Sequence, residues 1–343
     1  MTRRFFFAAM ISTISQREAV SSDFPAAIPL FSGDKMPLVG LGTWESKKVA
    51  SAVRCAITTG CNHIDCASAY RNQKEIGTEL VSLQGKHPRS SLWLTSKLWN
   101  DRRRPADVRD ALEQTLRELQ TEYLDLYLIH WPVVWARGSV MKPDASASLQ
   151  ETWRTLEALV DEGKVRNIGV SNYNEVELRD LLSYARIKPA VNQVELHPRL
   201  PQVSLVNFCA QNGIAVTAYS PLGRGDLKGA SLLSDPIVGK IAKAHAVSPA
   251  SVILRWNLER GVAVIPKSVT PSRIRSNARE PLTFALDRDE ISELNGLADG
   301  VRFCTAPWST FDDRTPVDRA VSTVLRNVAS AVFSVASVDI TSV

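Results

Sequence analysis

Short apolar runs alternate with longer amphipathic stretches along most of the chain, from about residue 38 to residue 298. The runs are too brief for helices, whereas the stretches between them repeat apolar residues at helical spacing. Leu112, Leu116 and Leu119 form such a helical stripe, and Leu124–His130 is the near-continuous apolar run of a strand buried on both faces. The pattern therefore predicts a series of βα units.

Eight strands and the helices between them follow from this alternation. The strands are predicted at Leu38–Thr43, His63–Asp65, Leu92–Leu98, Leu124–His130, Val165–Ser171, Ala190–Leu196, Ala215–Ser220 and Ala263–Ser268. Helices are predicted between them, among others at Lys47–Thr59, Ala106–Leu119, Leu149–Glu162, Glu175–Ala185 and Pro236–His245, and Gly60, Gly163 and Gly213 mark helix ends. Eight such units fit an α/β fold of the closed (β/α)8 TIM barrel type, and Ile28–Pro37 is predicted to be a β-hairpin at the barrel floor.

An open doubly wound sheet is the competing α/β fold. A sheet of that kind that binds a dinucleotide carries G-x-G-x-x-G after its first strand. The chain has only the glycine pairs Gly40/Gly42 and Gly223/Gly225, neither of which is followed by the third glycine. A P-loop, an H-E-x-x-H motif and a G-x-S-x-G motif are also missing from the sequence. We therefore expect the barrel, as one domain over residues 26–316.

Composition excludes several classes of protein. Of the 343 residues, 44% are hydrophobic and 22% are charged, which is enough apolar material for a sizeable core and excludes a disordered, collagen-like or coiled-coil chain. The net charge of +5 is dispersed, apart from the run 102–104, and is too small to indicate nucleic-acid binding. Five cysteines without a C-x-x-C pair fit a reducing compartment and indicate neither a zinc site nor a disulfide framework. No stretch reaches the roughly 20 apolar residues of a membrane span.

The two ends of the chain are atypical. Residues 1–25 contain arginines, serines and threonines but no acid before Glu18, which is compatible with a plastid or mitochondrial transit peptide or with a disordered leader. If residues 1–25 are not a transit peptide, we expect a cytoplasmic protein. Residues 317–343 are rich in serine, valine and alanine, and they fit a packed helix, a disordered end or an aberrant translation product.

Polar residues end the predicted strands, and some of them form a candidate proton-donating site. Taken singly, Asp65 reads as a helix N-cap, Lys97 as a surface amine and His130 as a buried histidine. Tyr70, five residues after Asp65, reads as an ordinary loop aromatic. In a (β/α)8 barrel, however, the carboxyl ends of all strands converge on one mouth. A carboxylate, an ammonium, an imidazole and a phenol at one mouth are the groups that a proton-donating site uses.

Several motifs of the sequence resemble those of one family. They are GCNHIDCASAYRNQKEIG, LTSKLWN, DLYLIHWP, IGVSNY, AVNQVELHP, AYSPLG and IPKSVTPSRIRSN. In their order and spacing they resemble the aldo-keto reductases, in particular the plant and aldose-reductase-like branch, over about residues 36–297. The resemblance implies a monomeric NADPH-dependent carbonyl reductase of the alcohol dehydrogenase (NADP+) or aldose reductase type. It places the family's catalytic tetrad on Asp65, Tyr70, Lys97 and His130.

The acidity of Tyr70, the proton donor that the resemblance implies, decides how such a tetrad works. Lowering a tyrosine pKa from about 10 by ~3 units takes ~4 kcal/mol of preferential stabilisation of the phenolate. An exposed ion pair supplies at most about 1 kcal/mol, so we expect Lys97 close to Tyr70 in a poorly solvated pocket. Asp65 would keep Lys97 charged, and His130 would donate a hydrogen bond to the substrate carbonyl.

The resemblance also implies which residues bind the cofactor and the substrate. Cofactor contacts are expected from Thr43, Trp44, Asp65, Ser171, Asn172, Gln193, Tyr219, Ser220, Pro221, Leu222, Lys267, Ser268, Arg273 and Asn277. Lys267, Ser268 and Arg273 match the family's grip on the adenosine 2′-phosphate, and two cations with a hydroxyl suit a phosphate, so we predict NADPH over NADH. A pocket for apolar or aromatic aldehydes is expected from Trp44, Tyr70, Trp99, His130 and Trp131. We expect no metal.

The match to the family weakens in several places, among them Cys61-Asn62, Ser276, Glu280-Pro281 and the segment after residue 301. Ser276 stands where the aldose-reductase branch has an acid that touches the adenine. Residues 302–314 only loosely resemble the loop with which family members close the substrate site, and the sequence does not indicate a sugar, a steroid or methylglyoxal as the substrate. The direction of Trp135, which is also near the mouth, does not follow from the sequence.

Two other functions are compatible with the same barrel. One is an NADPH-binding protein without turnover, because a fold does not guarantee an activity. The other is an aldol enzyme that uses Lys97 as a Schiff-base nucleophile, which is disfavoured because a lysine beside Asp65 tends to stay protonated. We predict the reductase, with a small-molecule carbonyl substrate and with neither a nucleic-acid nor a membrane partner.

Overall fold

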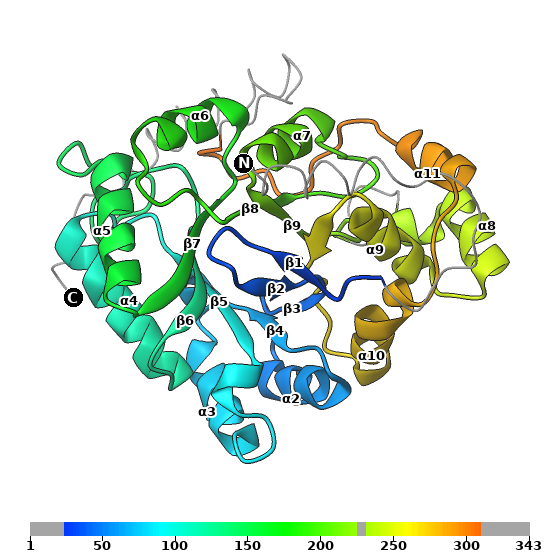
Figure 1. The fold of residues 1–343 in the computed structure, drawn as a ribbon, viewed down its shortest axis with the longest axis horizontal. Helices are drawn as coiled ribbons and strands as arrows, with labels where there is room; N and C mark the ends of the chain where they lie inside the picture. The colour runs from blue at the N-terminus through cyan, green and yellow to red at the C-terminus, as the bar shows by residue number, and fades with distance from the viewer. Residues whose placement is uncertain (1–23, 225–230, 310–343) are drawn as a thin grey trace, which may run out of the picture.

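The structure is a computed structural model that describes residues 24–224 and 231–309. The predicted tail at 317–343 lies outside the described residues, as does the predicted leader except for its last two residues. Eight parallel strands form one sheet in the order β10-β9-β8-β7-β6-β5-β4-β3 (Figure 1). They are β3 (Gly40–Gly42), β4 (His63–Asp65), β5 (Trp93–Leu98), β6 (Leu124–Ile129), β7 (Val165–Ser171), β8 (Val191–Glu195), β9 (Ala215–Tyr219) and β10 (Val262–Val264).

The first and last strands of this sheet meet and close it. Isolated parallel bridges join Val39 to Val264 and Gly42 to Lys267, and the Gly42 N–H donates to the Pro266 carbonyl at 3.2 Å. Gly42 is required at this seam, because a Cβ there would lie 2.7 Å from the Ile265 carbonyl oxygen. The predicted (β/α)8 barrel is thereby confirmed.

Helices surround the barrel on the outside (Figure 1). Their bounds are α2 (Val49–Thr59), α3 (Gln73–Leu83), α4 (Pro105–Leu119), α5 (Leu149–Asp161), α6 (Glu175–Tyr184), α7 (Val203–Asn212), α8 (Pro236–His245), α9 (Pro249–Glu259), α10 (Pro271–Arg279) and α11 (Arg288–Asn295). The sequence signals act at their ends: Ser148 and Asn174 form complete capping boxes, and Gly60 ends α2 with φ 97°. Within the described ranges no single helix is long and apolar enough to cross a membrane, and α8 with α9 reaches that length and composition only as a pair bent by 90°.

The last strand departs from its predicted bounds. The sequence predicts it at Ala263–Ser268, but β10 ends at Val264, and residues 265–268 continue as an irregular segment. Pro266 has no N–H with which to extend the ladder, so the strand pairing breaks off before it. Lys267 keeps a single bridge to Gly42, and the side chains of Lys267 and Ser268 line a cavity described below.

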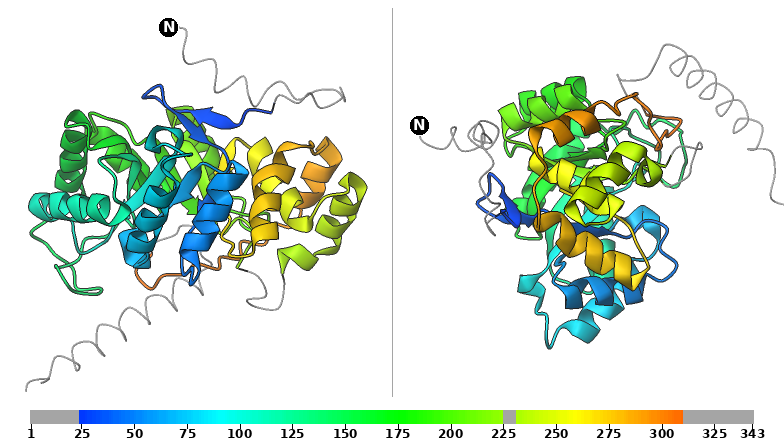
Figure 2. Two further views of the ribbon diagram at one scale, coloured as in Figure 1. Left: turned by 90° about the horizontal axis from the view of Figure 1, so that it is seen from below. Right: turned by 90° about the vertical axis from the view of Figure 1, so that its right-hand side faces the viewer.

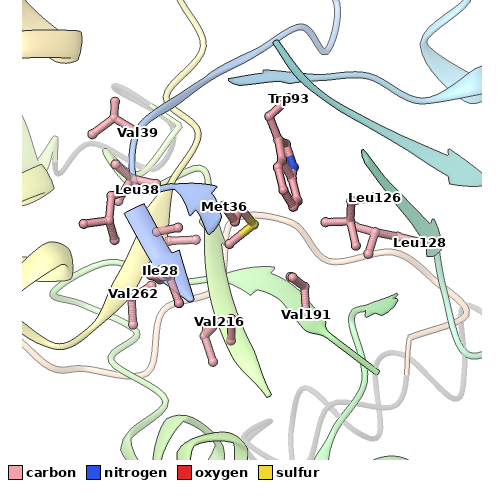
Figure 3. Packing of buried hydrophobic residues seen from close by; sticks show 14 of the residues in the cluster. Ile28, Met36, Leu38, Val39, Trp93, Leu126, Leu128, Val191, Val216 and Val262 are labelled. Carbon is pink, nitrogen blue, oxygen red and sulfur yellow. The ribbon is translucent and has the colours of Figure 1, made fainter. Parts of the chain in front are cut away.

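The predicted hairpin closes the amino-terminal end of the barrel. It consists of β1 (Ala27–Pro29) paired antiparallel with β2 (Lys35–Pro37). Met36 of β2 is fully buried, and Figure 3 shows it among Trp93, Val191 and Val216, which come from three different strands. The left view of Figure 2 shows the hairpin, in dark blue, at the opposite end from the orange segment that follows α11. The floor of the barrel is thus a packed core, and the other end is free to carry a site.

A buried histidine ties this hairpin to the barrel. The carbonyl of Pro37 accepts from His63 Nδ1 at 3.4 Å, and His63 Nε2 lies 3.1 Å from the hydroxyl of Thr95. Trp93 Nε1 donates to the same hydroxyl at 3.2 Å, so the hydroxyl proton faces His63 Nε2, which must accept. Burial lowers the pKa of His63 to about 4, although the charge of Asp65 acts in the opposite direction. The neutral imidazole is therefore the form that the fold requires.

This arrangement predicts a loss of stability in acid. Between pH 6.5 and pH about 4 the unfolded chain binds a proton at position 63 that the folded chain does not bind, so the free energy of unfolding falls as the pH falls. The contribution of His63 to stability is fully present above pH 6.5. About 3 kcal/mol of it is lost as the pH falls from 6.5 to about 4. Denaturant unfolding of the wild type and of His63→Gln from pH 7.5 to pH 4 measures it. The free energy of unfolding of the wild type should fall more steeply with decreasing pH than that of His63→Gln. Equal pH dependence of the two proteins would contradict the prediction.

Candidate active site

The carboxyl ends of three neighbouring strands bring the predicted tetrad together. Asp65 is the last residue of β4, Lys97 is the next to last of β5, and His130 directly follows β6. Tyr70 ends a short 3-10 helix, Ser68–Tyr70, in the loop after β4. The side chains of Asp65 and Lys97 are only 2% and 1% exposed, so they interact in a poorly solvated environment.

The ammonium of Lys97 is held by three oxygen atoms. Its Nζ donates to Asp65 Oδ2 at 2.6 Å, to the Cys66 carbonyl at 3.0 Å and to the Tyr70 hydroxyl at 3.2 Å. Burial alone would lower the pKa of Lys97, but the carboxylate of Asp65 and the oxygen of Tyr70 outweigh it and raise the pKa. Lys97 is therefore a charged donor aimed at Tyr70, as predicted, and it has no lone pair with which to act as a nucleophile.

Burial and the ammonium of Lys97 act on the acidity of Tyr70 in opposite directions. Burial raises its pKa to about 12, because removing the phenolate from water costs more than the ammonium of Lys97 returns. The proximity of Lys97 is as expected, but it does not bring the pKa of Tyr70 below the ordinary value in this site. Tyr70 is a fully protonated phenol at physiological pH, and Lys97 stabilises the phenolate only when the proton leaves.

The imidazole of His130 is neutral and faces the same space. Burial, together with the positive charges of Lys97 and Arg103, lowers its pKa well below the usual value. Its ring contacts those of Tyr70 and Trp99 edge to face, with centroids 5.9 and 4.9 Å apart. A neutral imidazole has a single N–H to donate, which is the form expected for a hydrogen bond to a carbonyl oxygen.

A second set of predicted residues supports the tetrad from the neighbouring strands. Gln193 Nε2 donates to Asp65 Oδ1 at 2.8 Å, and the hydroxyl of Thr43 donates to the Asp65 carbonyl at 2.7 Å. Asn172 donates to the His130 carbonyl at 2.9 Å and accepts from the Tyr219 hydroxyl at 2.7 Å. These residues also include Ser171, which donates to the Gln193 carbonyl at 2.7 Å. Predicted cofactor residues thus form one network with the tetrad.

A cavity of about 790 Å³ contains the remaining predicted cofactor residues, in the loops after β3, β9 and β10 and along α10. The predicted residues that line it are Trp44, Ser220, Pro221, Leu222, Lys267, Ser268, Arg273 and Asn277. Lys267 and Arg273 are exposed, and neither forms an ion pair with any residue in the described parts of the chain. Two uncompensated cations beside the hydroxyl of Ser268 suit a phosphate group, so the donors present fit a phosphorylated dinucleotide.

Four tryptophans lie together beside His130. Trp308 contacts Trp131, Trp135 and Trp99 edge to face, with centroids 5.9, 4.8 and 6.4 Å apart, and Trp135 also contacts Trp99 at 5.9 Å. We call these four residues the tryptophan wall. Trp44, which is predicted to contact both the cofactor and the substrate, lines the cavity: it is 40% exposed, and the guanidinium of Arg224 lies 4.2 Å above its ring. Its part in the substrate pocket stays a prediction.

Sequence reasoning missed Trp308. The residue is a bulky aromatic in a segment that resembles the family only loosely, and the sequence does not show where an irregular segment returns to the barrel. Its aromatic character is the one available signal, because an aromatic near the end of the domain is a candidate for an interface or a binding site. Trp135, whose direction does not follow from the sequence, also belongs to the wall.

The chain matches the family model described as Aldo/keto reductase family over residues 38–299. It belongs to this family. Aldo-keto reductase family 1 member A1 of Bos taurus is 44% identical over 311 residues, with 85% of this chain and 95% of that protein covered. The same protein of Homo sapiens is 43% identical at the same coverage. Among solved structures, the aldose reductase of Schistosoma japonicum is 40% identical with a TM-score of 0.76, covering 82% of this chain and 95% of that one.

These similarities support an aldo/keto reductase that reduces carbonyl compounds. The family model ends at residue 299, which is before the segment with Trp308. The assignment to the plant branch, the monomeric state and the cytoplasmic location stay predictions.

Proposed function

We propose that this aldo/keto reductase reduces aldehydes and some ketones to alcohols with NADPH, and that Tyr70 supplies the proton. The observation that carries the proposal is the buried contact chain from Asp65 through Lys97 to Tyr70, with distances of 2.6 and 3.2 Å. A structural ion pair would not need a phenol at its end, beside a neutral imidazole and an aromatic wall.

The cofactor residues follow from the fit described above. Lys267, Arg273 and Ser268 would hold the 2′-phosphate, and the other lining residues of the cavity would hold the rest of the adenosine diphosphate portion. Ser171, Asn172, Gln193 and Tyr219, with Thr43 and Asp65 next to them, would hold the nicotinamide portion. NADPH, when bound, supplies the hydride for the carbonyl carbon.

The chain's own residues then handle the carbonyl oxygen and its proton. His130 donates a hydrogen bond to the oxygen and holds it next to Tyr70. The proton moves from Tyr70 Oη to that oxygen, and the positive charge of Lys97, 3.2 Å from Oη, stabilises the negative charge left behind. Asp65 keeps this charge on Lys97, because its carboxylate outweighs the effect of burial on the lysine.

The tryptophan wall indicates the substrate class. Its aromatic faces and edges exclude water and pack against apolar or aromatic groups. We therefore propose aromatic and other apolar aldehydes as preferred substrates, held by Trp99, Trp131, Tyr70 and His130.

The absorbance of NADPH in the presence of aromatic, aliphatic and sugar aldehydes tests this proposal. Turnover that is fastest with aromatic aldehydes is the expected result. Binding of NADPH without any turnover would instead favour the binding-protein alternative. Borohydride trapping of a substrate adduct on Lys97 would favour the aldol alternative, which the ion pair with Asp65 opposes.

Cofactor preference has its own test. We expect Lys267→Met to raise the KM for NADPH roughly tenfold while the KM for NADH stays nearly unchanged, because a charge-assisted contact to the 2′-phosphate contributes on the order of 1.5 kcal/mol. Arg275→Met is the matched control: Arg275 lies on α10 like Arg273 but does not line the cavity, and its guanidinium contacts Cys55. An unchanged preference for NADPH in Lys267→Met, or an equal change in both variants, would contradict the assignment.

A further inference from the structure

The segment that carries Trp308 has little regular structure of its own. After α11 the chain returns to the mouth of the barrel, and residues 300–309 form neither helix nor strand. Within the segment, the Ser309 N–H donates to the Ala306 carbonyl at 3.0 Å and closes a turn. The position of Trp308 therefore depends on contacts between this segment and the barrel.

Glu195, the last residue of β8, provides a buried anchor for the segment. Its side chain is 0% exposed. Oε1 accepts from the Phe303 N–H at 2.7 Å, and Oε2 accepts from the Cys304 N–H at 2.8 Å. His197 Nε2 lies 3.0 Å from Oε1, and Arg302 Nη1 lies 4.0 Å from Oε2. One carboxylate thus binds two consecutive backbone amides, five and four residues before Trp308.

The charge of Glu195 is maintained in spite of its burial. Burial by itself would raise its pKa, but the hydrogen bond and the electrostatic interaction with His197, the positive charge of Arg302 and the Phe303 N–H together lower it. The two amide contacts are therefore charge-assisted, which makes them stronger than contacts to a neutral side chain. Next to them, Arg199 accepts from the Gly300 N–H at 2.9 Å through its carbonyl.

We propose that Glu195 is a positioning residue that holds Trp308 in the tryptophan wall and so sets the preference of the enzyme for bulky aromatic aldehydes over small ones. The inference rests on the proposed function, because it assigns the wall to the substrate. Without the anchor, the segment loses the contacts that fix where it crosses the mouth, and Trp308 no longer closes the wall over Trp99 and Trp131.

Glu195→Gln is the informative variant. The amide keeps the shape of the carboxylate but turns a donor toward one of the two backbone N–H groups, so one contact is lost and the charge with it. Glu157→Gln is a matched control. Glu157 is also buried, and its Oε1 accepts from the N–H groups of Arg186 and Ile187 at 2.7 and 2.8 Å, but it lies on α5 away from the mouth.

The kinetic result separates positioning from general damage. We expect Glu195→Gln to raise the KM for 4-nitrobenzaldehyde about tenfold while kcat/KM for propanal changes less than about twofold, because only the larger substrate uses the wall. Glu157→Gln should leave the ratio of the two substrates unchanged. Trp308→Ala should reproduce the change, and the double variant Glu195→Gln/Trp308→Ala should not exceed Trp308→Ala alone. Additive effects, or equal losses with both aldehydes, would overturn the proposal.

Hydrogen exchange gives a readout that does not depend on turnover. In the wild type the amides of Phe303 and Cys304 should be strongly protected, and Glu195→Gln but not Glu157→Gln should increase their exchange. Rapid exchange in the wild type would overturn the anchor even if Glu195→Gln failed to fold. If the protein reduced no aldehyde at all, the proposed function would fail, whereas protected amides would still show the anchor itself.

Discussion

Tyr70→Phe is expected to lower kcat/KM for aldehyde reduction by roughly 10²- to 10⁴-fold, which is the range that a positioned general acid contributes. The variant keeps the aromatic ring and its edge-to-face contact with His130, and it removes only the hydroxyl that lies 3.2 Å from Lys97 Nζ. The loss should therefore appear in the chemical step, and binding of NADPH, measured by fluorescence, should be unchanged. Tyr184→Phe, on α6 outside the site, is the control and should keep full activity.

The pH dependence of the wild type follows from the same site. Because burial raises the pKa of Tyr70 to about 12 and lowers that of His130 well below its usual value, neither group titrates between about pH 6.5 and pH 10. The rate of the reductive step should therefore be flat across this interval with respect to both residues. An ionisation near pH 7 that disappears in Tyr70→Phe would show instead that the phenol is strongly acidified. Unchanged activity of Tyr70→Phe would remove Tyr70 from the mechanism.

Lys97→Met is expected to destabilise the protein by about 3–5 kcal/mol and to abolish activity. It leaves Asp65 buried without the cation that now lies 2.6 Å away, and an uncompensated buried charge is far more costly than a missing pair. It also removes the charge that stabilises the deprotonated form of Tyr70. Stability and activity should thus fall together in this single variant.

The double variant Asp65→Asn/Lys97→Met separates the two effects. Neutral side chains of similar shape remove both charges, and the amide oxygen introduced at position 65 can still accept from Gln193, so most of the stability should return. Activity should stay absent, because nothing then stabilises the charge on Tyr70. Denaturant unfolding and NADPH consumption on the four proteins of this cycle measure both quantities. A double variant as unstable as Lys97→Met, or one that regains turnover, would contradict the role of the pair.

Much of the fold could be predicted from the chain because each prediction depended on local periodicity. The two-sided apolar run of β6 and the stripe on α4 reflect burial of single elements, and the capping residues act within one turn. Because the carboxyl ends of all eight strands lie at the same end of the barrel, Asp65, Lys97 and His130 meet at one mouth. Their convergence follows from the order of elements and needs no knowledge of distances.

The parts that could not be predicted depend on contacts between distant segments. The acidity of Tyr70 is a balance of burial against one ammonium, and its sign is set by how much water the closed barrel excludes. The position of the Trp44 ring beneath the guanidinium of Arg224 likewise depends on a contact between segments that are distant in the sequence. Residue types alone predict neither the pKa of Tyr70 nor the position of Trp44.

The sequence by itself thus determined the barrel, the hairpin at its floor and the identity of the residues at the mouth, because periodicity and strand ends depend only on residues that are close together in the chain. Only the tertiary structure decided that burial raises the pKa of Tyr70 despite the nearby ammonium of Lys97, that the first and last strands close the barrel, and that Glu195 binds the segment that carries Trp308. The physical reason is that desolvation, closure of the seam and anchoring of an irregular segment all arise from groups more than a hundred residues apart or from the packing of the whole barrel.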